Sequence, residues 1–104
     1  MIHVIATVRL RPGVRDTFLQ AFNANVPNVL AEDGCISYAP AIDLDSGIPA
    51  QGGIRDDVVT VVEQWESLDH LRAHLAAPHM ATYREKVKDL VEGATLQVLE
   101  PATA

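Results

Sequence analysis

The sequence has a single cysteine, fewer basic than acidic residues and no long apolar run, and each shortage excludes a class of protein. Cys35 stands alone, so no disulfide can form within the chain and no cysteine-based metal cluster can be built. The 8 lysines and arginines are scattered among 14 aspartates and glutamates, which leaves a net charge of −6. Nucleic acids and anionic membrane surfaces both require a basic patch, so we expect neither as a partner.

Hydropathy sets a further bound. No stretch approaches the roughly 18 apolar residues that a membrane span requires, and the chain begins with a strand-like alternation in place of a charged leader. What is present is typical of a globular domain, since 48% of the residues are apolar and 21% are charged. We therefore expect one soluble, cytoplasmic domain that spans residues 1–104.

Apolar periodicity predicts a strand and then a helix in the first third of the chain. Residues 2–10 alternate between apolar and other side chains, which is typical of a strand. Pro27 lies inside the helical pattern that follows, and it predicts a kink or a short second piece that ends near Gly34. The helix itself is indicated by four apolar residues spaced four apart, namely Val14, Phe18, Phe22 and Val26.

Two further strands are predicted on either side of a long loop. Residues 35–43 form the first, and Pro40 predicts an edge position because proline cannot donate to a ladder. Residues 44–57 contain three glycines and no usable period, which indicates a loop of the length that often serves as a lid or a pocket rim. Residues 58–66 follow with a β-branched run, and both faces of this strand are largely apolar.

The last third of the chain predicts two helical pieces and a final strand. Ser67 is suited to cap the first piece, and Pro78 separates it from the second. Gly93 is expected to end the second piece, before a short strand at residues 95–100. The first apolar face consists of Leu68, Leu71, Arg72 and Leu75, with His70 and His74 pointing elsewhere; the second consists of His79, Met80, Tyr83, Val87, Leu90 and Val91.

The resulting order β-α-β-β-α-β predicts an α+β, ferredoxin-like fold, in which both helices cover one face of an antiparallel sheet. No helix is left for the other face, where we expect Val59, Val61 and Trp65 or their counterparts. We therefore predict a homodimer whose two sheets pack face to face as a dimeric α/β barrel. A cavity is expected between the sheet and its helices, or at the sheet centre.

Short motifs lie along nearly the whole chain, namely Arg11-Pro12-Gly13, Glu32-Asp33-Gly34-Cys35, Tyr38, Glu63-Gln64-Trp65-Glu66-Ser67, Leu71, His74 and His79-Met80. Together they resemble one family, the antibiotic biosynthesis monooxygenase superfamily of small dimeric α+β barrels. Members include cofactor-independent oxygenases of quinols and hydroxylated aromatics, haem-degrading enzymes and proteins without a known reaction. The haem-degrading branch resembles this chain less, because its first strand carries an asparagine and this strand offers Thr7.

The resemblance implies a monooxygenase that uses molecular oxygen, and no cofactor, to oxidise a quinol or a hydroxylated polycyclic aromatic. Ground-state oxygen reacts poorly with closed-shell molecules, so the substrate itself must become an electron-rich anion. The protein must then supply a dry pocket, a base, and a polar group that stabilises the anion. Two alternatives are a non-catalytic small-molecule-binding or accessory dimer and a haem-binding protein.

The histidines are the candidate bases. His79 comes first, because imidazole titrates near neutral pH and Tyr83 lies one turn away on the same stripe; the alternative is a histidine that hydrogen-bonds the helix start after Pro78. Periodicity predicts that His74 lies at the surface, whereas the family pattern implies that it faces the pocket. Periodicity also places His70 in solvent. His70 and His74 have the spacing of two metal ligands, but no third ligand lies near them in sequence, so no metal site is predicted.

The other candidates would contact the substrate. Trp65 is suited to stack on a ring and to donate its indole N–H to an oxyanion, or it is a large core residue at the dimer interface. Glu63 is an acid on an apolar face and requires a partner, either a histidine or an arginine across the dimer. Tyr38 is a candidate pocket donor, and Tyr83 is a candidate substrate contact.

Overall fold

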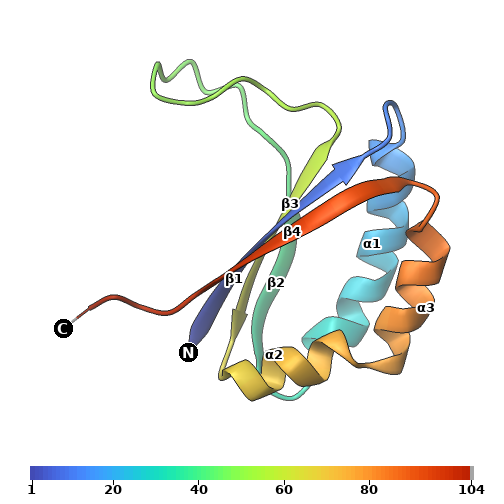
Figure 1. The fold of residues 1–104 in the computed structure, drawn as a ribbon, viewed down its shortest axis with the longest axis vertical. Helices are drawn as coiled ribbons and strands as arrows, with labels where there is room; N and C mark the ends of the chain where they lie inside the picture. The colour runs from blue at the N-terminus through green and yellow to red at the C-terminus, as the bar shows by residue number, and fades with distance from the viewer. Residues whose placement is uncertain (104) are drawn as a thin grey trace.

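The computed structural model describes residues 1–103, which form one antiparallel sheet and three helices. The strands lie in the spatial order β2-β3-β1-β4, and α1 and α3 pack side by side on one face of the sheet (Figure 1). This arrangement confirms the predicted ferredoxin-like α+β fold. The elements in chain order are β1 (Ile2–Leu10), α1 (Arg15–Leu30), β2 (Cys35–Ala41), β3 (Val58–Trp65), α2 (Leu68–Leu75), α3 (Pro78–Val87) and β4 (Val91–Leu99).

The core lies between the sheet and the helices. Alternation along β1 and β3 sends every second side chain inward, as the sequence pattern predicts. On the other side of the core, α1 contributes Phe18 and Phe22, whose rings are 5.9 Å apart. The nearly fully buried strand residues are Val4, Ala6, Val8, Leu10, Val59, Val61 and Trp65.

The opposite face of the sheet is not covered by helices. It carries the side chains of β1 and β3 that alternate with the buried ones. The sequence left open whether Val59, Val61 and Trp65 or their counterparts face this side, because both faces of the strand are largely apolar. Packing against the helices buries Val59, Val61 and Trp65, so the counterparts lie on the open face. The residues of β3 on the open face are Val58, Thr60, Val62 and Gln64, among which Val62 is 44% exposed.

Several helix and strand ends differ from the sequence-based expectation. α1 continues through Pro27 to Leu30 without a separate second piece. Burial of Val29 in the core holds the last turn in place despite the hydrogen bond that Pro27 removes. β4 begins at Val91, and Gly93 lies inside the strand where we expected it to end a helix. β4 starts earlier than expected because its first residues pair with the end of β1, where Val91 lies opposite Leu10 and Gly93 opposite Arg9. The predicted edge position of the strand that contains Pro40 is confirmed.

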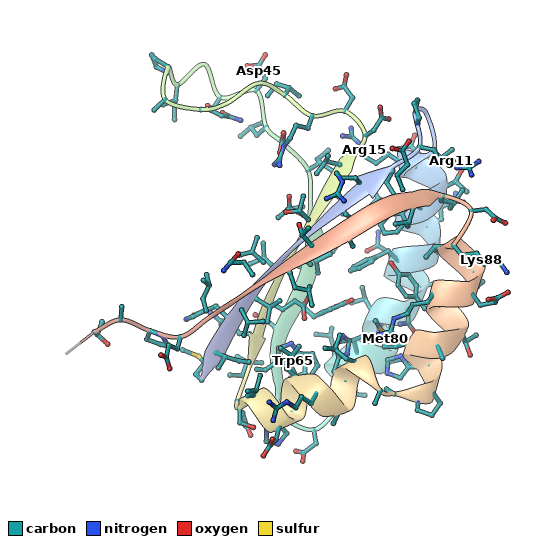
Figure 2. All side chains as sticks on the ribbon, viewed as in Figure 1. Arg11, Arg15, Asp45, Trp65, Met80 and Lys88 are labelled. Atoms are coloured by element: carbon teal, nitrogen blue, oxygen red, sulfur yellow. The ribbon has the colours of Figure 1, made fainter. Side chains whose placement is uncertain are left out.

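The loop between β2 and β3 projects from the end of the sheet, away from the helices (Figure 1). A bidentate pair between Asp43 and Arg55 joins its two arms, with Arg55 Nη2 2.8 Å from Asp43 Oδ1. Asp45 on this loop and Trp65 lie at opposite ends of the molecule (Figure 2). Within one chain, therefore, the loop lies far from Trp65 (Figure 2). No helix within residues 1–103 is long and apolar enough to cross a bilayer.

Candidate active site

Three ionisable side chains from separate elements meet at the end of the molecule where α2 packs. Glu32 lies in the turn between α1 and β2, His74 in the last turn of α2, and His79 in the first turn of α3. His74 Nδ1 is 2.7 Å from Glu32 Oε2, and His79 Nε2 is 3.3 Å from the same oxygen. Sequence reasoning placed Glu32 in a family motif but did not identify it as a site residue, since its partners lie far along the chain and a turn has no periodicity.

The turn that carries Glu32 is held against the start of α2. Gly34 has a φ of +79°, and a Cβ at this position would lie 2.2 Å from His70 Cγ, so the His70 ring packs directly over the glycine. Ser67 caps α2 by accepting the backbone N–H of His70. His70 is therefore a half-buried structural residue, and our prediction that it lies in solvent was wrong. Its packing holds α2, and with it His74, next to Glu32.

His74 belongs to a buried aromatic cluster. Its side chain is only 2% exposed, and its ring lies 4.6 Å from that of Trp65 and 5.5 Å from that of Tyr38, between centroids. The prediction of a surface position from periodicity was wrong, because this two-turn helix buries Leu71 and His74 and leaves Leu68 42% exposed. The helix is too short for its apolar spacing to determine the buried face.

Trp65 and Glu63 are partners of each other in this cluster. The Trp65 indole Nε1 donates to Glu63 Oε1 at 2.9 Å, and both side chains are almost completely buried. The acceptor of the indole N–H is thus already defined, and Trp65 has no exposed surface at which to contact a ligand in this conformation. Within this chain the partner of Glu63 is neither a histidine nor an arginine. The carboxylate that contacts the histidines is Glu32.

Burial determines the charge states in the cluster. It lowers the pKa of His74, although the hydrogen bond to Glu32 acts in the opposite direction. We therefore assign a neutral His74 whose Nδ1–H donates to Glu32. Burial raises the pKa of Tyr38 and of Tyr83, so both phenols stay protonated and each keeps an O–H that can donate. Burial also raises the pKa of Glu63 to about 6, despite the hydrogen bond from Trp65.

Replacing Glu63 by glutamine should change how stability depends on pH. Because folding raises the pKa of Glu63 from an ordinary 4.5 to about 6, its contribution is fully present below pH 4.5 and is lost as the pH rises through 6. Relative to the wild type, Glu63→Gln should gain about 1–2 kcal/mol of unfolding free energy between pH 4.5 and pH 7.5. Urea unfolding at both pH values measures this, with the exposed Glu66→Gln as the control. A difference that is independent of pH would contradict the assignment.

A groove of about 230 Å³ lies between α1 and α3. Both ring nitrogens of His79 are buried without a hydrogen bond, since the 3.3 Å approach to Glu32 meets the distance of an ion pair but not the angle of a hydrogen bond. The side chain is 25% exposed, so its exposed part is the carbon edge of the ring. The groove is lined by Ala21, Ala24, Asn25, Asn28, His79, Thr82, Tyr83 and Lys86.

The groove therefore separates the six predicted site residues into two groups. His79 and Tyr83 line it, whereas the other four form the buried cluster and do not. The four buried residues are Tyr38, Glu63, Trp65 and His74. A single hollow shared by all the candidate residues, as we expected from the sequence, is not found in one chain.

The trio of Glu32, His74 and His79 has the composition of a two-histidine, one-carboxylate metal set. Its geometry differs from that of such a site, because His74 Nδ1 and Glu32 Oε2 are hydrogen-bonded to each other at 2.7 Å. Among residues 1–103, no group of three or more His, Cys, Asp or Glu side chains is placed to hold a metal ion. The arrangement is suited to proton transfer and charge stabilisation at a histidine.

Comparison with known proteins agrees with the fold. The chain is 45% identical over 103 residues to the probable quinol monooxygenase YgiN of Escherichia coli strain K12, covering 97% of this chain and 98% of the relative. It is similar to the structure of Rv0793 from Mycobacterium tuberculosis (TM-score 0.78, 27% identity, covering 99% and 96% of the two chains). The structure of PA3566 from Pseudomonas aeruginosa shares the fold (TM-score 0.80, 20% identity, 98% and 94%). The family model described as antibiotic biosynthesis monooxygenase matches residues 1–86, and the chain therefore belongs to this family.

Proposed function

We propose that the protein is a monooxygenase that oxidises a quinol with molecular oxygen and without a bound cofactor. The observation that carries this proposal is the histidine–carboxylate pair of His79 and Glu32 beside the groove between α1 and α3. The similarity to a protein named as a probable quinol monooxygenase, over nearly the full length of both chains, supports the same reaction class.

The volume of the groove favours a small substrate. At about 230 Å³ it is smaller than the roughly 300–1,000 Å³ typical of pockets for drug-sized ligands. A hydroquinone of one or two rings suits this space better than a polycyclic phenol. Asn25, Asn28 and Tyr83 offer hydrogen-bonding groups along the groove, and Lys86 offers a positive charge for the substrate anion.

The reaction begins with the transfer of a hydroxyl proton from the quinol to His79. For this step the imidazole turns about its Cβ–Cγ bond, whose torsion angle has a wide allowed range, and the turn brings a ring nitrogen to the groove. The anion then donates an electron to oxygen, and the two radicals combine. One oxygen atom stays on the ring, the other leaves as water, and the product is a hydroxylated quinone. The substrate supplies all four electrons, so the reaction requires no other reductant.

Oxygen uptake tests the proposal directly. One-ring and two-ring hydroquinones and a three-ring anthrone are offered in metal-chelated, flavin-free buffer, and the products are identified by mass spectrometry. We expect uptake with the smaller substrates and one added oxygen atom in the product. Saturable binding without uptake would favour the alternative of a non-catalytic binding dimer, which the buried nitrogens of His79 also fit. A Soret band after addition of haemin would instead indicate haem binding.

We also propose that the protein works in the cytoplasm as a homodimer that joins the open faces of two sheets. Support comes from the exposed apolar side chains on this face, such as Val62 (44% exposed) and Leu99 (42%). We expect Val62→Lys to dissociate the dimer, as measured by sedimentation velocity. The matched control is Leu30→Lys, which changes a side chain that is 51% exposed on α1. A wild-type monomer at micromolar concentration would rule the dimer out.

A further inference from the structure

We propose that Glu32 and His74 are positioning residues for His79: His74 fixes the Glu32 carboxylate, and Glu32 orients His79 and balances the charge that His79 acquires from the substrate proton. The proposal rests on the proposed monooxygenase function. It assigns different roles to two histidines that the sequence presents as equivalent candidates.

The first step concerns access. His74 is 2% exposed and is enclosed by Trp65 and Tyr38, so a ligand in the groove does not contact it. His79 lines the groove and is 25% exposed. Both ring nitrogens of His79 are buried in this conformation, but a turn of its ring brings one of them to the groove, which is not open to His74. A base must come within hydrogen-bond reach of the proton that it abstracts, directly or through one water, which excludes His74 from that role.

The second step concerns the shared oxygen. Glu32 Oε2 accepts the Nδ1–H of His74 at 2.7 Å and lies 3.3 Å from His79 Nε2. One carboxylate oxygen has capacity for two donors. Because burial lowers the pKa of His74, this residue is a neutral donor that directs the carboxylate without adding a second positive charge. Glu32 then remains available as the counter-charge for His79.

The third step follows the proton. The substrate O–H bond breaks, its electron pair stays on the substrate oxygen, and the proton moves to the His79 nitrogen that the turn of the ring has brought to the groove. The other nitrogen keeps its proton and directs it to Glu32. A carboxylate plays the same part in Ser-His-Asp triads, where it holds the tautomer and stabilises the imidazolium. The other ionisable groups around the trio are Cys35 and Tyr38 on β2, Glu63 on β3, and Arg84 and Lys86 on α3.

The test compares Glu32→Gln with Glu32→Asp, and His74→Gln with His79→Ala, on a hydroquinone that the wild type oxidises. For Glu32→Gln we expect kcat to fall at least roughly tenfold, with little change in KM. A fall of this size is part of the rate enhancement that a general base supplies. The dependence of kcat/KM on pH should change as well, because Glu32→Gln removes the carboxylate that lies 3.3 Å from His79 Nε2. Glu32→Asp should restore part of the rate, and His74→Gln should lose less than His79→Ala.

A second readout does not require turnover. The ¹⁵N shifts of the His74 side chain should show an Nδ1–H tautomer in the wild type and should change in Glu32→Leu, which removes the acceptor of that hydrogen bond. The matched control is Asp33→Asn, which also removes one negative charge. Asp33 is the next residue along the chain, and its side chain is exposed and lies 3.5 Å from His70. We expect this control to leave kcat, the pH profile and the His74 shifts unchanged.

Three results would overturn the proposal. The roles are reversed if His74→Gln abolishes turnover and His79→Ala retains it. Glu32 is only structural if Glu32→Gln lowers the melting temperature but leaves kcat and the pH profile intact. His74 and Glu32 do not hold each other if His74 keeps its tautomer and its shifts in Glu32→Leu. Failure of the proposed function is distinguishable from these, because a wild type that oxidises no hydroquinone still reports the His74 tautomer.

Discussion

Replacing His79 by alanine should lower kcat for hydroquinone oxidation by roughly 10²–10⁴-fold, the usual contribution of a general base. The substrate must lose a proton before it can donate an electron to oxygen, and His79 is the only histidine among the described residues that lines the groove. Substrate binding should change much less than kcat, since Tyr83 and the asparagines of α1 remain. Steady-state oxygen uptake, with the folded state checked by circular dichroism, measures the effect.

The matched control for this variant is Lys88→Ala. Lys88 follows the last turn of α3, is exposed, and pairs with Glu85 at the surface, so its removal tests whether any change near this helix affects the rate. We expect wild-type kcat from the control. If His79→Ala retained more than about a tenth of wild-type kcat, the contribution of His79 would fall below the range of a general base, and its assignment would be wrong.

Replacing Gly34 by alanine should lower the free energy of unfolding by about 2–5 kcal/mol. Two effects add: a left-handed backbone costs an L-residue roughly 1–2 kcal/mol, and an overpacked contact costs roughly 1–3 kcal/mol. Gly34 has a φ of +79°, and the new Cβ would lie 2.2 Å from His70 Cγ, near the rigid base of that side chain. Urea unfolding monitored by the fluorescence of Trp65 measures the change. Turnover should fall as well, because the same turn positions Glu32.

Gly47 offers a control that separates the two effects. Its φ is +70°, but a Cβ there would meet nothing within 4 Å, since it lies in the projecting loop. Gly47→Ala should therefore show the backbone cost alone, roughly 1–2 kcal/mol or less. Equal losses of unfolding free energy in the two variants would mean that His70 moves away from the new Cβ without cost. The inference that His70 packing holds the turn against α2 would then be wrong.

The local patterns of the sequence account for most of the fold. The alternation along β1, the spacing of four along α1 and the break at Pro78 all appear in the structure at the expected places. The errors lie where an element is short or symmetric. α2 has eight residues, so Leu71 and His74 could be buried only at the expense of Leu68, and the pattern alone favoured the leucines.

The candidate site was predicted less completely than the fold. His79 and Tyr83, which share one stripe in the sequence, both line the groove. The family resemblance implied that His74 faces the pocket, but His74 is buried and does not line the groove. Glu32 was missed as a site residue because turns have no periodicity, and only its place in the motif before Cys35 pointed to it. The partner of Glu63 was missed because Trp65, two residues away on the same face of β3, had been assigned to the substrate.

The sequence by itself determined the elements, their order and the family, because alternation, helical spacing and short motifs are properties of neighbouring residues. Only the tertiary structure decided which of the two apolar faces of β3 meets the helices, and which carboxylate meets His74 and His79. Both choices depend on segments that are distant in sequence approaching one another. Local periodicity is the same for either outcome, and close packing selects between them.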